Sequence, residues 1–310
     1  MMAIYHTRRT FGRFLGAALF EMPHRRARAA KLQWEAQPTA QSAYKRRYRA
    51  DAQIVLLSVP ILHRSGVGGG TASWSEAREM RLLEFTGYSL PEHAAGLRRL
   101  GFVRELARVA QPESESLYFG VMTASPEESA AEARRALYEQ KQTCMYSAIE
   151  GRMAPGIVET AGARFTAPSQ MSPARYEDLV AMAQQALLSA APKAPEFDPG
   201  AGCERTFLQA VAVLLEDPAP SVETRYVYNG RLYRLRLGKS ADPKATAYFR
   251  DKRLISQDAK VIRTEGKLHR EAGGPETVFH LWVEQGSIRP LPLRIEYQAK
   301  PYLRLTFEAE

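Results

Sequence analysis

The stretch RYVYNGRLYRLRL (Arg225–Leu237) decides how the second half of the chain should fold. Asn229-Gly230 at its centre is the dipeptide preferred in two-residue β-hairpin turns, because both residues tolerate positive φ. Tyrosine and valine precede it, and after it Tyr233, Leu235 and Leu237 alternate with Arg234 and Arg236. We therefore predict two antiparallel strands joined by a tight turn.

The same alternation continues to the end of the chain. Apolar residues recur at odd positions, and charged residues such as Arg294 and Glu308 fall between them. A period of two on successive segments predicts an antiparallel sheet with one solvated face. The apolar positions are Tyr233, Leu235, Leu237, Phe279, Leu281, Val283, Leu291, Leu293, Ile295, Tyr297, Leu303, Leu305 and Phe307.

The first half of the chain mixes strand and helix signals. Ser89 and Glu92 form a capping box around Pro91, which predicts the start of a helix. The helical stripe that follows is Leu97, Leu100, Val103, Ala107 and Ala110. Further helices are predicted from Ser125 to Gln140, from Ser172 to Ala190 and over 206–216. Strands are predicted from Tyr48, over 80–88 and 116–124, and around 145–150 and 157–165.

The segment PKAPEFDPGAG (192–202) is the clearest boundary, with three prolines and two glycines. We predict an α+β protein in which an N-terminal mixed α/β unit precedes a mainly antiparallel β-sheet domain. The expected divisions are a basic leader and linker over 1–47, the mixed unit over 48–191, a linker over 192–202 and the sheet domain over 203–310.

The net charge of +9 comes entirely from the start of the chain. Residues 1–50 hold 11 lysines and arginines and two acids, whereas the remainder holds 32 bases and 32 acids. A neutral body lacks the broad positive field that phosphate binding requires, so no specific nucleic-acid partner is expected. The basic segment could still bind anionic lipid or nucleic acid by itself.

Three interpretations of the leader stay open. Thr7-Arg8-Arg9-Thr10-Phe11 has the form of a twin-arginine export signal, 14–20 would be its apolar region, and Ala27-Arg28-Ala29 suits cleavage. Removal up to Ala29 would take six bases and one acid and lower the net charge from +9 to +4. The alternatives are a basic amphipathic helix on an anionic membrane and a basic tail.

Two further features bear on the setting of the protein. No window approaches the roughly 18 consecutive apolar residues of a spanning helix, so we expect no transmembrane span in the mature chain. Cys144 and Cys203 have no second ligand at metal spacing. They are expected to be two unpaired thiols, and in an exported protein they could instead form one disulfide.

The C-terminal residues suggest a family. The residues concerned are Trp282-Val283-Glu284, Gly286, Arg289 and Leu291-Pro292-Leu293-Arg294-Ile295-Glu296. In this pattern residues 278–310 resemble the end of a family of bacterial envelope proteins known as a domain of unknown function. The rest of the chain resembles bacterial proteins without an assigned activity. The resemblance implies an antiparallel sheet and an exported setting, and it supplies no catalytic residues.

The sequence offers few residues for chemistry. The run Gly66–Thr71 lacks both the sixth-position glycine of a dinucleotide fingerprint and the lysine of a phosphate loop, so a turn or bulge is expected. His63 and Ser65 could form a base–nucleophile pair, but no nucleophile elbow surrounds Ser65. His269 and His280 have no metal-ligand spacing.

Two aromatic features in the C-terminal half could bind a ligand. Trp282 could stack on a ligand, although it is more commonly a cross-strand packing residue. A face made of Tyr226, Tyr228, Arg234 and Arg236 could bind single-stranded nucleic acid, but a solvated sheet face is the simpler interpretation.

We therefore predict no catalytic, cofactor-binding or metal-ligating residue and no cofactor. The expected function is a non-enzymatic, exported protein of the periplasm or envelope that binds an apolar ligand or an envelope protein. One alternative is an enzyme with scattered catalytic residues. The other is a cytoplasmic protein that binds anionic membrane or nucleic acid through its basic N-terminus.

Overall fold

The Asn229-Gly230 turn forms as the sequence predicts. Asn229 has φ 51° and Gly230 has φ 71°, and together they join β9 (Ser221–Tyr228) to β10 (Arg231–Ala241). Arg231 pairs with Tyr228 directly across the loop. Positive φ at both central residues matches the right-handed twist of the flanking strands.

The computed structural model describes residues 44–56, 59–77, 80–94, 96, 98–108, 115–124, 143–154, 156–168, 171–198, 205–300 and 303–310. The remaining strands are β1 (Tyr44–Leu56), β2 (Val59–Ala77), β3 (Met80–Ser89), β4 (Leu100–Arg108), β5 (Ser116–Thr123), β6 (Thr143–Ala154), β7 (Ile157–Pro168), β8 (Pro192–Lys193), β11 (Val261–Arg270), β12 (Thr277–Glu284), β13 (Arg294–Lys300) and β14 (Leu303–Ala309). The helices are η1 (Pro173–Arg175), α2 (Tyr176–Leu187), α3 (Phe207–Glu216) and α4 (Pro243–Asp251).

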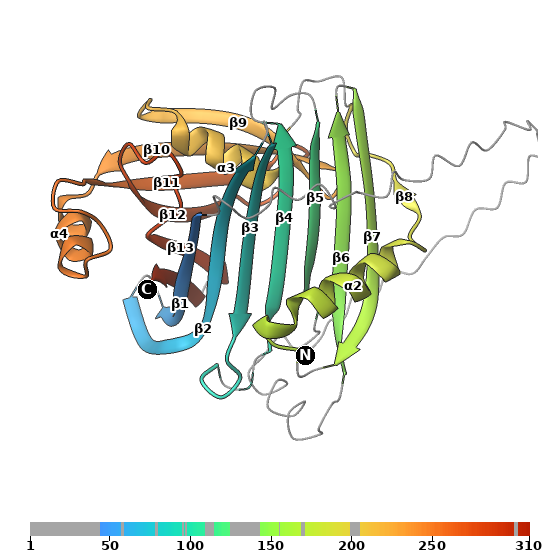
Figure 1. Cartoon of the computed structure of the whole chain (residues 1–310), viewed down its shortest axis with the longest axis horizontal. Helices are drawn as coiled ribbons and strands as arrows, with labels where there is room; N and C mark the ends of the chain where they lie inside the picture. Colours follow the sequence, from blue (N-terminus) through green and yellow to red (C-terminus); the bar gives the residue numbers. More distant parts are fainter. Residues whose placement is uncertain are drawn as a thin grey trace, which may run out of the picture. The chain divides into compact units, whose positions relative to one another are not determined.

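All the described strands belong to one antiparallel sheet of 14 strands. Its order is β8-β7-β6-β5-β4-β3-β2-β1-β14-β13-β12-β11-β10-β9, so every pair of adjacent strands is consecutive in sequence except β1 and β14. There Tyr48 lies opposite Ala309. Figure 1 shows β2–β7 side by side, with β9–β13 crossing them at a steep angle.

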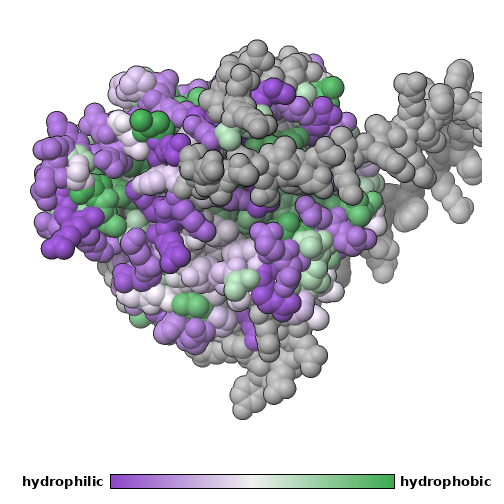
Figure 2. Space-filling view, in the orientation of Figure 1, coloured by the Kyte–Doolittle hydropathy of each residue, from purple (hydrophilic) through white to green (hydrophobic). Residues whose placement is uncertain are grey.

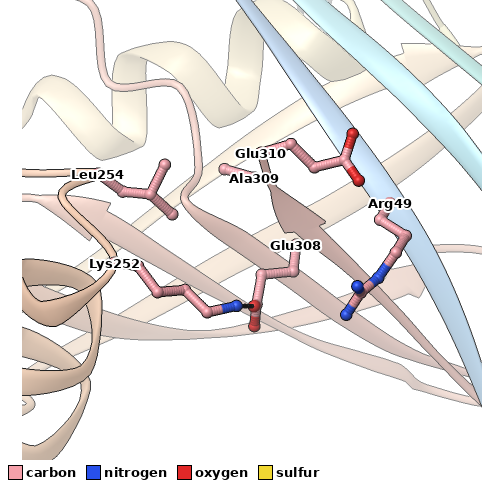
Figure 3. Close-up of a pocket in the computed structure, with 6 residues that line it drawn as sticks. All are labelled: Arg49, Lys252, Leu254, Glu308, Ala309 and Glu310. Carbon is pink, nitrogen blue, oxygen red and sulfur yellow. Dashed lines mark hydrogen bonds and ion pairs between the residues drawn. The ribbon is translucent and has the colours of Figure 1, made fainter.

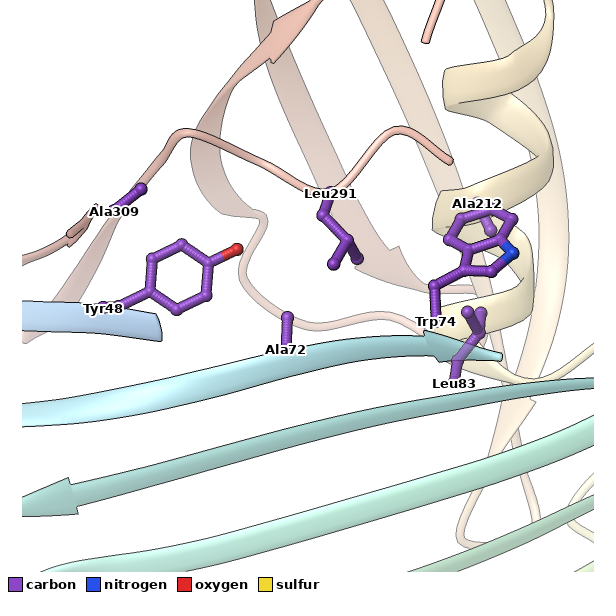
Figure 4. Packing of buried hydrophobic residues seen from close by; sticks show 7 residues of the cluster. All are labelled: Tyr48, Ala72, Trp74, Leu83, Ala212, Leu291 and Ala309. Carbon is purple, nitrogen blue, oxygen red and sulfur yellow. The ribbon is translucent and has the colours of Figure 1, made fainter. Parts of the chain in front are cut away.

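Helix α3 packs against the face of the sheet that we call the inner face. Leu235, Leu237 and Leu281 of one group of strands are buried with Ala210 and Leu214 of the helix. Trp74 and Leu83 of the other group are buried with Ala212 (Figure 4). The helix therefore fills part of the space between the two groups of strands, and this explains why its ten residues are so apolar.

The outer face of the sheet is covered by the other helices. Tyr176 of α2 packs on Phe102 of β4, and Phe249 of α4 is buried with Trp282 of β12. Asp242 begins α4: its side chain accepts from the Ala245 N–H, and Pro243 occupies the first turn. Several strands are thus covered on both faces.

The tip of the β9–β10 hairpin approaches the other end of the sheet. Val227 and Leu232 are buried against Met153 and Val158 of β6 and β7. The Glu196 N–H donates to the Gly230 carbonyl at 2.9 Å. These contacts bring the two ends of the strand order together without a ladder between β8 and β9.

The predicted α+β class is wrong. The described chain is dominated by antiparallel strands that form a single sheet, with only short helices packed on it. The predicted N-terminal mixed unit contributes β1–β7 to the same sheet as the C-terminal strands. Residues 37–310 form one compact unit, and β8 lies within the segment expected to be a linker.

The helix predicted after Ser89 is also wrong. The described residues 91–94 and 96 form a turn, and Leu100–Arg108 form the strand β4. Phe102 points to the outer face, where it meets α2, whereas Glu105 points to the inner face, where it meets α3. A strand buried on both faces loses its alternating pattern, so apolar residues happened to fall at helical spacing.

The other predictions for the described region fare better. The helices over 176–187 and 207–216 and the strands β3, β5, β6 and β7 lie where the sequence places them. The segment predicted as a helix from Ser125 to Gln140 and the leader up to residue 43 lie outside the described residues. Within the described residues, every helix is too short or too polar to cross a bilayer.

Candidate functional site

A row of glycines crosses the inner face of the sheet. Gly70 of β2 lies opposite Gly87 of β3, and Gly87 lies opposite Gly101 of β4. Met122 of β5 continues the row beside Gly101. Because three neighbouring strands carry no side chain here, the inner surface is bare backbone at this level.

The space above these glycines differs along the row. A Cβ added at Gly101 would meet nothing nearer than 4.0 Å, whereas one at Gly70 would lie 3.5 Å from the Phe307 ring. Phe307 and Phe85 pack edge to face, with ring centroids 5.9 Å apart. The row is therefore open at Gly101 and closed by aromatic rings at Gly70.

The apolar residues around the row are only partly buried. Met122 is 56% exposed and Met145 is 41% exposed, although both lie on the inner face. We call the set the inner apolar patch; it comprises Phe85, Gly87, Gly101, Val103, Met122, Met145, Ile149 and Phe307. Figure 2 shows the side of the molecule on which α2 lies, where apolar residues reach the surface between charged ones; the inner apolar patch is on the opposite face of these strands. Apolar surface left open on a concave face is suited to an apolar ligand.

The outer face behind the row is closed. The Tyr176 hydroxyl lies 3.0 Å from the Gly87 carbonyl and 3.2 Å from the Gly101 carbonyl. Burial raises the pKa of Tyr176, so it stays a neutral donor. The glycine backbone is thus held from behind while its inner side stays bare.

Two cations lie at the far side of the patch. Arg164 of β7 pairs with Ser147, which pairs with Met122, so Arg164 shares the cross-strand row of the glycines. The Lys193 ammonium lies 2.8 Å from the position of a Cβ added at Gly162, which places it over the inner face of β7. Both residues are exposed.

Glu105 is a buried carboxylate at the start of α3. Its Oε2 accepts from the Thr206 hydroxyl and, at 3.0 Å, from the Gln209 N–H. Its Oε1 and the Gln209 Nε2 are buried without a hydrogen-bond partner in the described part of the chain. Burial raises the pKa of Glu105 to about 7, against the opposing effect of the donors at the helix start. This group anchors α3, and the structure assigns no reacting partner to it.

A shallow pocket of about 180 Å³ lies beside α4 and the end of β14 (Figure 3). Arg49, Lys252 and Glu308 contribute charged groups to its lining. Glu308 already accepts from Lys252, from the Tyr248 hydroxyl at 2.6 Å and from Arg294 at 2.6 Å. Because the Glu308 carboxylate is already hydrogen-bonded to three protein groups, this pocket is less suited to a ligand than the inner apolar patch.

The residues singled out near the N-terminal strands do not form a reactive pair. His63 lies on the outer face, where its Nε2 is 3.7 Å from Asp51 Oδ2. Ser65 lies in the irregular part of β2 where the register with β1 shifts. Gly66 has φ 63° and donates to Asp51 at 2.7 Å, so the glycine run begins in a β-bulge, as expected.

The aromatic and histidine candidates of the C-terminal half form no open site, although the His280 and Trp282 ring centroids lie 6.1 Å apart. His280 is 3.6 Å from Glu265, and His269 lies four residues further along β11. Trp282 is buried under α4, where its indole N–H donates to Asp242 at 2.9 Å, so it presents no stacking surface. Burial and Arg263 lower the pKa of His280.

The proposed aromatic and basic face does not exist as one surface. The hairpin register places Tyr226 and Tyr228 on the inner face and Arg234 and Arg236 on the outer face. The arginines pair there with Glu223. Cys144 lies partly buried in β6, and Cys203 lies outside the described residues, so their relation stays a prediction.

Neither the inner apolar patch nor Glu105 was predicted from the sequence. An isolated glycine inside a strand pattern often marks a close approach, and FTGY contains one, Gly87 of the row. An acid within FVRELAR is likewise unusual for a buried segment. Nothing in the spacing of Arg164 and Lys193 could have placed them together.

Comparison with known proteins gives little at the level of sequence. No family model matches the chain, and no curated protein matches it. The solved structure described as a β-barrel-like protein of domain of unknown function DUF1849 from Brucella abortus is similar, with a TM-score of 0.45 and 5% identity. The match covers 86% of this chain and 95% of that chain. That protein is bacterial and of unknown function, and the envelope family suggested by residues 278–310 stays a prediction for this chain.

Proposed function

We propose that this protein is a non-enzymatic binding protein that holds an apolar ligand on the inner face of its curved sheet. The observation that carries the proposal is the inner apolar patch, which is floored by glycine and partly exposed. Each methylene group that such a surface removes from water contributes about 0.8 kcal/mol. Burial of an apolar ligand on the patch therefore gives a favourable binding free energy without any change in the sheet.

The rival function is an enzyme with catalytic residues scattered along the sequence. It requires a concave site where titratable groups converge, with His63 or His280 among them. Both histidines lie on the outer face, away from the inner apolar patch. The geometry of the described residues therefore favours binding over catalysis.

The test is binding of the neutral probe N-phenylnaphthylamine, whose fluorescence rises in apolar surroundings. Gly101→Phe would place a ring in the open space of the row. We expect this variant to weaken probe binding at least about tenfold, the effect of losing two or more buried methylene groups. The matched control is Gly238→Phe, since Gly238 is also an open strand glycine but lies on the outer face.

Wild-type protein and Gly238→Phe should bind the probe alike, and circular dichroism should show that all three proteins are folded. An unchanged affinity in Gly101→Phe, or no probe binding by the wild type, would overturn the proposal.

The proposal includes export, which rests on the twin-arginine pattern of the leader. Arg8→Lys with Arg9→Lys should leave the full-length chain in the cytosol, because the signal requires the arginine pair. Arg25→Lys with Arg26→Lys is the control. N-terminal sequencing of protein from cell fractions would read the outcome. An intact wild-type N-terminus in the cytosol would instead favour a cytoplasmic protein with a basic membrane- or nucleic-acid-binding segment.

A further inference from the structure

The positions of Arg164 and Lys193 give the inner apolar patch a charged end. Arg164, Ser147, Met122, Gly101 and Gly87 lie opposite one another in turn on five neighbouring strands. Neighbouring strands are roughly 4.8 Å apart, so the row spans about 19 Å along the sheet. It runs from a cation, across partly exposed methionine and bare backbone, towards the Phe85 and Phe307 rings.

Lys193 reinforces this charge. Its ammonium lies over Gly162, which pairs with Ile149 of the patch. The described contacts give neither Lys193 nor Arg164 a carboxylate partner, whereas arginines such as Arg231 and Arg270 nearby are paired with Glu196. One end of the apolar row therefore carries two cations that no carboxylate of the described residues neutralises, and an anionic group of a ligand could pair with them.

We infer that the ligand is an anionic amphiphile with a single extended apolar chain. This inference rests on the proposed function. The chain lies along the row above Gly101 and Gly87, and the anionic head group accepts hydrogen bonds from Lys193 and Arg164. A protein segment is a poorer occupant, because β2–β7 are each paired on both sides and offer it no free strand edge.

The experiment measures displacement of N-phenylnaphthylamine by three compounds with the same dodecyl chain, each below its micelle concentration. They are laurate, dodecyl maltoside and dodecyltrimethylammonium, which are anionic, neutral and cationic. We expect laurate to bind at least about tenfold more tightly than the other two. Acetate, which has the same head group without the chain, should not displace the probe.

The double variant Arg164→Gln with Lys193→Gln should bind laurate at least about tenfold more weakly and should bind dodecyl maltoside with unchanged affinity. Both side chains are exposed, so the double variant should fold. The control is Lys244→Gln with Lys260→Gln, which removes the same charge from exposed positions at and beyond α4. It should leave all three affinities unchanged.

The outcomes separate the two proposals. If no dodecyl compound displaces the probe, or the probe itself does not bind, the proposed function fails and this inference fails with it. If all three compounds bind equally, or if the double variant weakens laurate and maltoside alike, only the anionic head group is overturned. Displacement by acetate would mean that a free anion, and not an amphiphile, occupies the cationic end.

Discussion

At the scale of single residues, Glu105 shows how a polar group can organise an apolar interior. It is fully buried, yet it meets the first N–H groups of α3, where a helix has donors without partners. The helix start favours a negative charge, while burial opposes it and prevails in setting the pKa. The carboxyl group therefore titrates near neutral pH inside the sheet.

The stability of the protein should consequently fall as the pH rises. The folded pKa of about 7 lies above the usual 4.5, so between these values the folded state binds the proton more tightly than the unfolded state. Protonated Glu105 therefore contributes about 3 kcal/mol to the free energy of unfolding. This contribution is complete below pH 4.5 and is lost as the pH rises towards 7. Glu105→Gln should remove this slope in urea unfolding measured from pH 5 to 8.

The same variant should be more stable than the wild type at pH 8, because its amide oxygen can still accept from the helix without carrying charge. An unchanged slope in Glu105→Gln would show that another group is responsible. Glu150→Gln is the comparison variant: burial also raises the pKa of this carboxyl, which lies away from α3, so this variant should reduce the slope by less than Glu105→Gln does.

Asp242 offers a second prediction at this scale, because its two oxygens have separate roles. Oδ1 accepts from the Ala245 N–H and Oδ2 accepts from the Trp282 indole, at 2.9 Å each. Asp242→Asn should keep the cap but lose the indole acceptor, and Asp242→Ala should lose both. We expect losses of about 1 and about 2–3 kcal/mol in the free energy of unfolding, measured by urea titration. Equal losses would mean that only one of the two contacts matters.

At the scale of elements, α3 is fixed at both ends by charged side chains of the inner face. Glu105 of β4 meets its first turn, and Arg81 of β3 holds Glu216, its last residue, through two hydrogen bonds of 2.7 and 3.0 Å. The Arg81 guanidinium also lies 4.4 Å from the centre of the Trp74 ring. These contacts set the depth and direction of the helix between the strands.

Removing the arginine should therefore loosen the helix. Arg81→Met would remove the guanidinium that binds both Glu216 and Glu76, and we expect a loss of about 2 kcal/mol in unfolding free energy, below the value for a fully buried pair because both acids are partly exposed. Arg175→Met, which breaks the exposed Arg175–Asp178 pair, should cost less than about 0.5 kcal/mol. A similar loss in both variants would show that the Arg81 contacts are no more than a surface pair.

The elements also show how far the sequence could be interpreted. The C-terminal strands were predictable because charged residues such as Arg234 and Glu308 occupy every second position, between buried apolar residues. The strand β4 was not, because α2 and α3 cover its two faces and remove that alternation. The apolar helix α3 was recognised from its composition, but its place inside the sheet depends on Glu105 and Arg81, which are more than a hundred residues away.

The candidate site was harder to predict than the elements. Gly70, Gly87 and Gly101 form a row only because the hairpins between their strands set that register. A shift of one residue in any of these strands would place side chains of the opposite face in the row. Spacing along the sequence carries no such information, so the inner apolar patch becomes visible only in three dimensions.

At the scale of the whole molecule, the pairing of β1 with β14 links the two halves of the chain. The interior core on one side of α3 joins Trp74 of β2 to Ala212 of the helix and Leu291 near β13. Shared cores of this kind make unfolding of one half costly for the other. We therefore expect residues 37–310 to unfold as one cooperative unit, and the division into parts over 48–191 and 203–310 stays a prediction that unfolding can test.

Two tryptophans report on the two halves separately. With Trp34→Phe as the common background, Trp282→Phe leaves Trp74 as the probe and Trp74→Phe leaves Trp282 as the probe. Each variant has its own stability, so its fluorescence transition in urea is compared with its own far-ultraviolet circular dichroism. We expect the two signals to coincide in both variants, because neither half keeps its core when the β1–β14 ladder and α3 are lost. A fluorescence transition that separates from circular dichroism in either variant would instead indicate two domains that unfold independently.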